Sequence, residues 1–381
     1  MKILRIVSEL DFGGVEQVLA ISVPYLIHTK GYEVLVVVLG KGGRISEGLV
    51  QNGFSIFVLD HKTRIPNIKL VFRLKNLIEN EKPDVVHCQG SEANFHGLWA
   101  AKIAGVKIKI GEEIGLPNHH SYWKLVFKWV YQKADRVIAI SEAVKNCIVE
   151  LGEVEREKVR VVYNPVEIRK GVFPCRIEKG FDHVTNEMTC RQSEVSYTKG
   201  EMKKPFIFIS ICRLVPIKNL ERLIEAFSRL QKNDVKNHVV LWIVGDGPLK
   251  KSLMQLANRL EIHESVKFFG FQENVFHYLQ QANVFVLPSL REGSSVSLAE
   301  AMSYGLPSIV TKIGGAIEIL GESQPGFLVN PFNTDSIFSA MLDMLNLSEE
   351  ERKKMGENAK VSSNRFSVKT YIGNLIEVYK G

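Results

Sequence analysis

The run Val239-Val240-Leu241-Trp242-Ile243-Val244, followed at once by Gly245-Asp246-Gly247-Pro248, decides the fold class. Its six residues are apolar without alternation, which is typical of a strand buried on both faces, as in a parallel sheet covered by helices. The turn after it is followed by a segment with helical spacing. We therefore predict a strand–turn–helix unit here.

The same unit recurs along almost the whole sequence and predicts an α/β protein. Strand candidates in the first half are Lys2–Ser8, Glu33–Leu39, Ser55–Leu59, Asp84–His87, Lys107–Ile110, Arg136–Ile140 and Lys158–Val162. After an irregular polar segment, the candidates are Phe206–Ile211, Val239–Val244, Val266–Phe269, Val284–Leu287, Ser308–Thr311 and Phe327–Val329. We predict two doubly wound, Rossmann-like domains that face a central cleft, because ligands of open α/β sheets bind beyond the carboxyl ends of the strands.

The predicted boundaries follow from where this rhythm stops and resumes. We expect a first domain over 1–166, a linker or insertion over 167–205 and a second domain over 206–365. A helix over 366–381 closes the chain and could return to the first domain. Helical spacing also predicts Ile68–Asn80, and Glu142–Leu151 with Ser141 as its N-cap.

Composition excludes several classes of protein. With 381 residues, 45% hydrophobic and 24% charged, the chain is neither disordered, collagenous nor a coiled coil. Five scattered cysteines without a C-x-x-C pair argue against a disulfide scaffold or a zinc site. We see no secretory signal and no apolar run near the ~20 residues of a membrane span, and expect a cytoplasmic protein. The net charge of +7 fits phosphate-bearing substrates, anionic lipid or nucleic acid without choosing among them.

Two glycine-containing turns are candidate phosphate sites. Gly13 and Gly14 follow the first strand and open a helix, and Gly245 and Gly247 occupy the equivalent place in the second half. Glycines there let backbone N–H groups approach an anion at the positive end of a helix. A tight turn without a ligand is the alternative for both, and neither completes the dinucleotide motif G-x-G-x-x-G.

Two cations follow the strand Phe206–Ile211. A guanidinium at Arg213 and an ammonium at Lys218, one of them just before a helix, would suit a diphosphate. The alternative is a pair of solvated surface cations.

The strongest signal lies in Pro288–Ala301, where Glu292 and Glu300 are eight residues apart. The intervening Gly293-Ser294-Ser295, with Val296 after it, would present amides and hydroxyls at a helix N-terminus. Glu300 could accept two hydrogen bonds from a vicinal diol such as a ribose. An acidic first turn followed by a surface glutamate is the alternative.

This element resembles the signature of family 4 of the retaining glycosyltransferases, which have the GT-B fold. Further elements occur in the family's order: Phe12-Gly13-Gly14, Asp84-Val85-Val86-His87, Ile140-Ser141, Arg213 with Lys218, Gly245-Asp246-Gly247-Pro248, Phe269-Gly270-Phe271, and Gly314-Gly315 with Glu318. The resemblance covers nearly the whole chain except 169–205.

The resemblance implies transfer of a sugar, with retention, from a nucleotide diphosphate sugar to an acceptor. It implies that Arg213 and Lys218 neutralise the leaving diphosphate, and that Glu292 and the amides of Gly293, Ser294, Ser295 and Val296 hold the donor sugar. Glu300 would bind the ribose, Phe271 would flank the base, and Gly13, Gly14, Gly245 and Gly247 would approach the donor. Cationic side chains then replace a metal, in keeping with the absence of a D-x-D sequence, and no cofactor is expected.

The chain departs from the family pattern in two places. Many members carry a histidine after the strand that here ends near Ile110, whereas this chain has Gly111-Glu112-Glu113. Glu113 and His119 are both candidates for that acceptor-side part, and neither can be assigned. The insertion 169–205 has no family role.

The segment Tyr122–Tyr131 predicts an aromatic helix with Trp123, Val126, Phe127 and Val130 on one face. Packing of that face against the sheet is one interpretation. Residues 102–133 also hold six lysines against two acids, Glu112 and Glu113, so a peripheral contact with anionic membrane is a second hypothesis.

The sequence thus favours a metal-independent retaining glycosyltransferase that uses a nucleotide sugar, with a UDP-sugar as the first expectation. The expected acceptor is a saccharide or a lipid-linked saccharide in cell-surface polysaccharide or glycolipid synthesis. The alternatives are a nucleotide-sugar-binding protein without transfer activity and a GT-B sugar-nucleotide epimerase. Nucleic acid is not an expected partner, because no basic run of five or more residues occurs.

Overall fold

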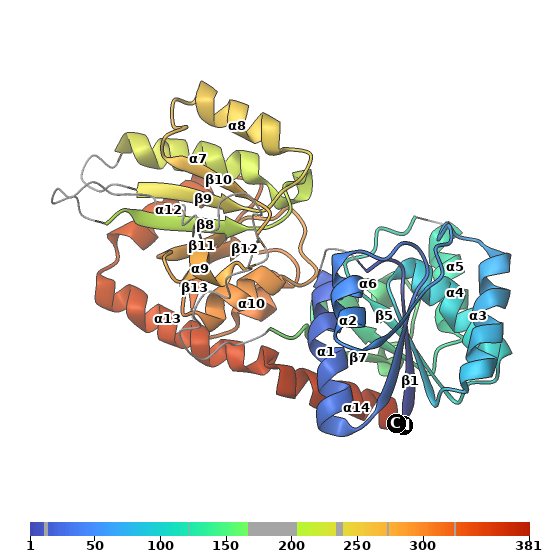
Figure 1. Cartoon of the computed structure of the whole chain (residues 1–381). Helices are drawn as coiled ribbons and strands as arrows, with labels where there is room; N and C mark the ends of the chain where they lie inside the picture. The colour runs from blue at the N-terminus through green and yellow to red at the C-terminus, as the bar shows by residue number, and fades with distance from the viewer. Residues whose placement is uncertain (11–13, 121, 167–203, 234–238, 273, 324) are drawn as a thin grey trace, which may run out of the picture.

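Two parallel β-sheets, one in each half of the chain, form the frame of the computed structural model (Figure 1). The structure describes residues 1–10, 14–120, 122–166, 204–233, 239–272, 274–323 and 325–381. The first sheet has seven strands in the order β3-β2-β1-β4-β5-β6-β7. Its strands are β1 (Lys2–Val7), β2 (Glu33–Val38), β3 (Ser55–Val58), β4 (Val85–Gln89), β5 (Ile108–Glu113), β6 (Arg136–Ala139) and β7 (Val159–Val161).

The second sheet has six strands in the order β10-β9-β8-β11-β12-β13. Its strands are β8 (Phe206–Ile211), β9 (Val239–Val244), β10 (Val266–Gly270), β11 (Val284–Leu287), β12 (Ser308–Thr311) and β13 (Gly326–Val329). In each sheet the first strand pairs with the second and the fourth of its domain. This reversal of strand order is the switch point at which doubly wound sheets bind ligands, so the predicted fold class is confirmed.

Helices cover both faces of each sheet. In the first half these are α1 (Gly14–Lys30), α2 (Arg44–Gln51), α3 (Ile68–Glu81), α4 (Ser91–Ile103), α5 (Tyr122–Tyr131) and α6 (Glu142–Glu150). In the second half they are α7 (Leu220–Asn233), α8 (Lys250–Arg259), α9 (Phe276–Leu279), α10 (Val296–Ser303), α11 (Ala316–Leu320), α12 (Thr334–Asn346) and α13 (Glu349–Ser363), while the last helix, α14 (Val368–Lys380), packs on the first domain. Successive residues of one strand, such as Val36 and Val37, enter different cores, which is why these strands are apolar without alternation.

Most predicted elements differ from the observed ones by one or two residues, but β5 is a larger correction. The prediction ended this strand at Ile110, and it continues through Gly111 and Glu112 to Glu113. The two carboxylates are 3% and 4% exposed, because side chains of neighbouring elements bond them. A pattern of apolar residues cannot reveal a strand end that is buried through polar contacts. The predicted insertion 169–205 lies, apart from residues 204 and 205, outside the described residues.

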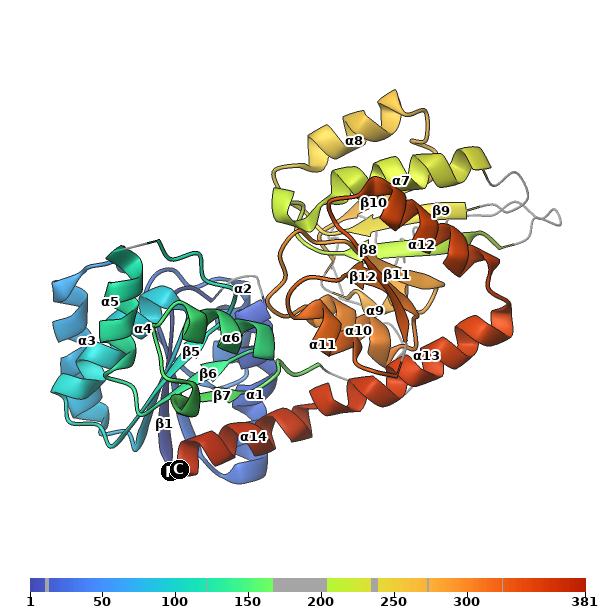
Figure 2. The same ribbon diagram turned by 180° about the vertical axis from the view of Figure 1, so that it is seen from behind.

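The last helix returns to the first domain. Figure 2 shows α13 running along the second domain and α14 continuing beneath the first. Val166 and Ser367 form a parallel bridge where the chain crosses between the domains, and the Val166 amide donates to the Phe366 carbonyl at 2.8 Å. Tyr371, Leu375 and other residues of α14 belong to the same apolar core as α1.

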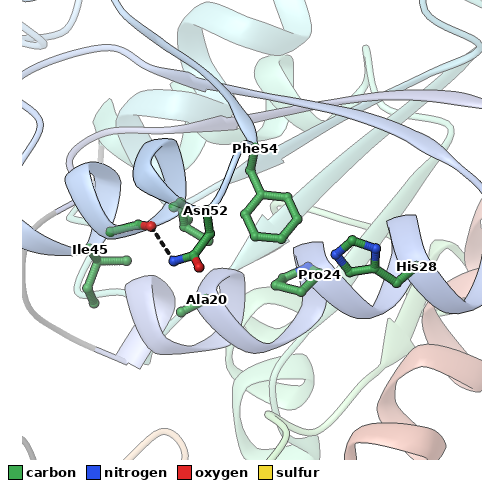
Figure 3. A pocket seen from close by; sticks show the side chains of 8 residues that line it. Ala20, Pro24, His28, Ile45, Asn52 and Phe54 are labelled. Carbon is green, nitrogen blue, oxygen red and sulfur yellow. Dashed lines mark hydrogen bonds between the residues drawn. The ribbon is translucent and has the colours of Figure 1, made fainter.

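Two further findings concern the length of the helices and a hollow in the first domain. Among the described helices, none is long and apolar enough to cross a bilayer. A hollow of about 470 Å³ lies between α1 and α2, lined by Pro24, His28, Ile45, Asn52 and Phe54 among others (Figure 3). It contains none of the predicted site residues.

Candidate active site

The turn after β8 carries Lys218, the last residue of a short 3-10 helix (Pro216–Lys218). Asn219 follows it in the left-handed conformation, with φ 58°. The buried Asn219 amide donates to the carbonyls of Pro288, at 3.0 Å, and Pro331, at 2.7 Å. Asparagine tolerates this backbone conformation better than most residues do, so Asn219 fastens the turn to the loop after β11.

Lys218 and Glu292 form an ion pair at this junction. Lys218 Nζ donates to Glu292 Oε2 at 2.6 Å, and Ser289 Oγ donates to the same oxygen at 3.1 Å. The side chains are 16% and 7% exposed. The opposite charges and the Ser289 hydroxyl compensate each other's loss of water, so the pair lies ready at the carboxyl ends of β8 and β11.

The Gly314-Gly315 turn fixes the backbone of Glu292. The Gly315 amide donates to the Glu292 carbonyl at 2.9 Å. A Cβ on Gly314 would lie 2.2 Å from that oxygen, and a Cβ on Gly315 would lie 2.0 Å from the Gly293 oxygen. Only glycine allows the two turns to pack this closely, so these glycines hold the backbone of Glu292 and Gly293 in place.

The N-terminus of α10 lies directly after this loop. Ser295 caps the helix, because its hydroxyl accepts from the Leu298 amide at 3.2 Å. Val296 opens the helix, and its Cγ2 lies 3.9 Å from a Cβ built on Gly14, the first described residue of α1. Two helix N-termini from different domains therefore approach each other, and their dipoles favour an anion between them.

Glu300 lies one turn further along α10. Burial raises the pKa of its carboxyl to about 7, compared with the 4.5 of an ordinary glutamate. A carboxyl with this environment can exchange between neutral and charged forms near neutral pH, which is common at functional sites.

Other predicted donor residues have a different setting. Arg213 is exposed. Gly245 has φ 137° and a Cβ there would lie 1.9 Å from the Cys212 oxygen, while a Cβ on Gly247 would lie 2.6 Å from the Leu214 oxygen. Packing therefore explains why both positions are glycine, since a glycine lets this turn lie against the backbone that carries Arg213. Phe271 is 48% exposed, and Gly13 lies outside the described residues.

The first domain meets the site through the loop after β5. A Cβ on Gly293 would lie 3.2 Å from Gly115 Cα and 3.2 Å from Leu116 N. Arg291 Nη2 donates to the Pro117 carbonyl at 2.6 Å. The residues that flank Glu292 in sequence thus touch the other domain directly.

A second contact between the domains involves Glu318 of α11. Its carboxylate accepts from the amides of Glu142, at 2.8 Å, and Ala143, at 3.0 Å, at the N-terminus of α6. The Tyr163 hydroxyl donates to the same carboxylate at 3.0 Å. A carboxylate at a helix N-terminus is favourable, so Glu318 ties the second domain to the first.

The two acceptor-side candidates are Glu113, at the end of β5, and His119, in the loop that follows β5. Tyr131 Oη donates to Glu113 Oε2 at 2.7 Å. Burial raises the pKa of Glu113 to about 7, and the Tyr131 hydrogen bond offsets only part of that effect. His119 Nδ1 lies 2.6 Å from Glu153 Oε1, and its ring stacks on Phe127 with centroids 4.3 Å apart. The Glu153 side chain has no exposure, so it holds the imidazole by one nitrogen in a fixed orientation.

The structure thus unites Lys218, Glu292, Gly293, Ser295, Val296 and Gly14 at one junction. Sequence reasoning missed Ser289, Asn219 and Arg291, which support or connect that junction, and Glu153, which holds His119. A possible signal for Asn219 was an asparagine directly before a helix. Arg291 and Glu153 have partners more than 30 positions away, whereas the partner of Ser289 is three positions away. No local pattern marks any of these three polar residues.

Two Rossmann-like domains that contact each other beside the loop of Glu292 have the architecture of the GT-B fold class. Comparison with known proteins agrees. A model described as "Glycosyltransferase Family 4" matches residues 12–170, and one described as "Glycosyl transferases group 1" matches residues 193–362. The chain belongs to this family of glycosyltransferases.

Individual relatives show how far the likeness extends. The chain is 30% identical over 287 residues to the UDP-Gal:alpha-D-GlcNAc-diphosphoundecaprenol alpha-1,3-galactosyltransferase of Escherichia coli, covering 73% of this chain and 70% of that protein. It is 25% identical over 375 residues to the N-acetylgalactosamine-N,N'-diacetylbacillosaminyl-diphospho-undecaprenol 4-alpha-N-acetylgalactosaminyltransferase of Campylobacter jejuni, covering 94% of each. The crystal structure of Anabaena HepE in complex with UDP has the same fold, with a TM-score of 0.79, 22% identity and 100% of both chains covered.

Proposed function

We propose that this glycosyltransferase moves a sugar, with retention, from a nucleotide diphosphate sugar to a saccharide acceptor. The observation that carries the proposal is the Lys218–Glu292 pair in the loop that leads into α10, whose N-terminus approaches that of α1. Cleavage of the bond between the sugar and the diphosphate leaves negative charge on a phosphate oxygen. A preorganised ammonium and two helix dipoles are suited to stabilise that charge without a metal.

Each residue then has a distinct part. Lys218 and the exposed Arg213 neutralise the leaving diphosphate, and Glu292 exchanges its bond with Lys218 for bonds to the donor sugar. Glu300 accepts the ribose hydroxyls, with Phe271 against the base. The amides of Gly293 to Val296, together with the Gly13-Gly14 and Gly245-Gly247 turns, complete the donor site. These assignments follow the chemistry that each group can supply.

The acceptor side has its own assignment. His119 is the candidate to take the proton of the attacking hydroxyl, because Glu153 holds its Nδ1 and leaves Nε2 for that purpose. Glu113, held by Tyr131, is the candidate to position the acceptor.

Names of the relatives suggest the substrates. The E. coli relative uses UDP-galactose, and both bacterial relatives act on saccharides linked to diphosphoundecaprenol. We therefore propose a UDP-sugar as donor and a lipid-linked saccharide as acceptor, in cell-surface polysaccharide or glycolipid synthesis. The enzyme would work at the cytoplasmic face of a membrane, with peripheral contact.

A donor panel tests the proposal. The protein is incubated with UDP-, GDP- and dTDP-sugars in EDTA, with and without synthetic polyprenyl-diphosphate saccharides, and products are followed by mass spectrometry and anomeric NMR. Transfer with an α-linked product from an α-donor supports it. A changed sugar nucleotide without acceptor identifies an epimerase, and binding with neither hydrolysis nor transfer identifies a binding protein. Lys218→Ala, Arg213→Ala and Glu292→Ala must each reduce transfer severely, and wild-type turnover in all three overturns the site assignment.

A further inference from the structure

Helix α5 has one face in the core and an apolar face in solvent. Phe127, Val130 and Tyr131 are buried, at 2%, 0% and 1% exposed. Leu125 and Trp129 are 69% and 51% exposed. Tyr122, at 62%, joins them on the same side, because residues spaced by three, four and seven share one face of a helix. Trp123 and Val126 of the predicted inner face are only partly buried.

Helix α4 extends this apolar face. The rings of Trp99 and Trp129 lie 4.1 Å apart, centroid to centroid. Ile103, one turn after Trp99, is 48% exposed. Lys133 Nζ lies 4.7 Å above the Trp99 ring and 5.3 Å from the Trp129 ring. We call Trp99, Ile103, Tyr122, Leu125 and Trp129 the α5 surface.

Lysines of α4, of α5 and of the segment between α4 and β5 accompany the α5 surface. Lys102, Lys107 and Lys128 are exposed and Lys124 is partly exposed, and across the described ranges these four lysines form no ion pair. The acids that accompany them in sequence, Glu112 and Glu113, are buried inside the sheet. Asp135 nearby pairs with Lys109, whose side chain is largely buried.

We propose that the α5 surface seats the enzyme on an anionic lipid bilayer. Exposed tryptophan, tyrosine and leucine among lysines are the residues that enter the interfacial region of membranes, with each lysine attracted to anionic headgroups. A protein partner fits less well, because lysine is depleted in protein interfaces. Nucleic acid fits less well too, because the centre of the surface is apolar.

The location of this surface connects it to the acceptor side. α5 directly follows the loop whose Pro117 carbonyl binds Arg291, and Phe127, on its inner face, stacks on His119. A bilayer against the outer face of α5 would lie one helix away from the acceptor-side residues. This step rests on the proposed function, in which the acceptor is lipid-linked.

Vesicle binding tests the inference. The full chain is sedimented with vesicles of phosphatidylcholine alone or with 30% phosphatidylglycerol, at low and high salt. We expect binding to the anionic vesicles that weakens with salt. Leu125→Ser/Trp129→Ser and, separately, Lys124→Glu/Lys128→Glu should each reduce it about tenfold or more. Matched controls in the second domain are Val361→Ser/Phe332→Ser, which are 70% and 61% exposed, and Lys353→Glu/Lys354→Glu.

A second measurement keeps the test independent of folding and of transfer. Brominated anionic lipids should quench tryptophan fluorescence in the wild type and much less in Trp129→Phe. Donor hydrolysis without vesicles should be unchanged in all α5 variants, which shows that they are folded and that the donor site is intact. Absence of binding to anionic vesicles, or equal loss in the controls, overturns the α5 surface and the peripheral membrane contact while leaving the proposed transfer reaction standing. Binding without any transfer or hydrolysis supports the surface and overturns the proposed function.

Discussion

Each domain buries charge beside its parallel sheet, but the two clusters differ in what covers them. In the first domain Arg5, with no exposure, donates to Ser22 at 2.9 Å and to Gln89 at 2.6 Å. Gln89 in turn donates to Glu112 at 3.1 Å. In the second domain Lys218 binds Glu292.

Helix α14 makes the difference between them. Tyr379 of α14 lies over the first cluster, with its hydroxyl 2.8 Å from His87 Nδ1, and His87 Nε2 lies 2.8 Å from Glu112. The Lys218 and Glu292 side chains keep 16% and 7% exposure, and the first domain approaches their loop at Gly115. The comparison teaches that both domains bury charge, so burial of charge does not by itself mark a functional site.

The largest expected effect distinguishes the two clusters by activity. Glu292→Gln removes the charge and keeps the shape, and we expect transfer to fall by about 10²–10³-fold, the usual cost of losing one preorganised electrostatic contact. Initial rates at saturating donor measure it. Glu112→Gln in the first cluster is the matched control and should keep near wild-type turnover in its folded fraction. Equal losses of turnover would contradict the distinction.

The second expected effect is on stability. Arg5→Met leaves Glu112 buried without its nearby cation, so the free energy of unfolding should fall by about 3–5 kcal/mol. Urea denaturation measures it. Arg160→Met, which replaces an exposed arginine in the same sheet, should change stability by less than about 0.5 kcal/mol. A small effect of Arg5→Met would show that the first cluster is dispensable for folding.

The third expected effect is that Glu300 and Glu112 change the stability of the protein with pH in opposite directions. Burial raises the pKa of Glu300 to about 7, so the folded protein holds this proton more tightly than the unfolded chain. That contribution to stability is present below the unfolded pKa of 4.5 and is lost as pH rises through about 7. Burial alone would also raise the pKa of Glu112, but the His87 hydrogen bond and the charges of His87 and Arg5 lower it. Its contribution is therefore present above pH 4.5 and is lost as pH falls.

Thermal unfolding between pH 4 and 8 checks this difference. Glu300→Gln should flatten the decline in Tm between pH 5 and 8, and Glu112→Gln should flatten the decline below pH 5. The same slope in Glu300→Gln and the wild type would contradict the assigned burial of Glu300.

The smallest expected effect concerns helix α14, which covers the first cluster. Tyr379→Phe removes one hydrogen bond to His87 and should lower the free energy of unfolding by about 1 kcal/mol without changing turnover. Tyr371→Phe, in the same helix, is the matched comparison. A loss of activity in Tyr379→Phe would mean that the sealed cluster communicates with the site.

Local sequence predicted the sheets well, because strands such as Val239–Val244 are apolar on both faces and need no distant partner to be recognised. It also singled out Lys218 as a cation for a diphosphate and Glu292 as a carboxylate for the donor sugar, and these two roles stay predictions. It could not predict that these two would bind each other, because the Asn219 contacts that bring them together join positions 69 and 112 residues apart. The end of β5 and the role of Glu153 escaped for the same reason, since both depend on partners from other elements.

The crossing at Val166 and Ser367 bears on the exchange of domains between relatives. A chimera that takes the second domain from another family member cannot simply change parent at the linker and continue to the C-terminus. Residues 368–380 would then come from the wrong parent, and Tyr379 would have to meet a foreign His87 and Arg5. The natural unit of exchange is therefore an internal block that ends near the bridge, with the last helix inherited alongside residues 1–166.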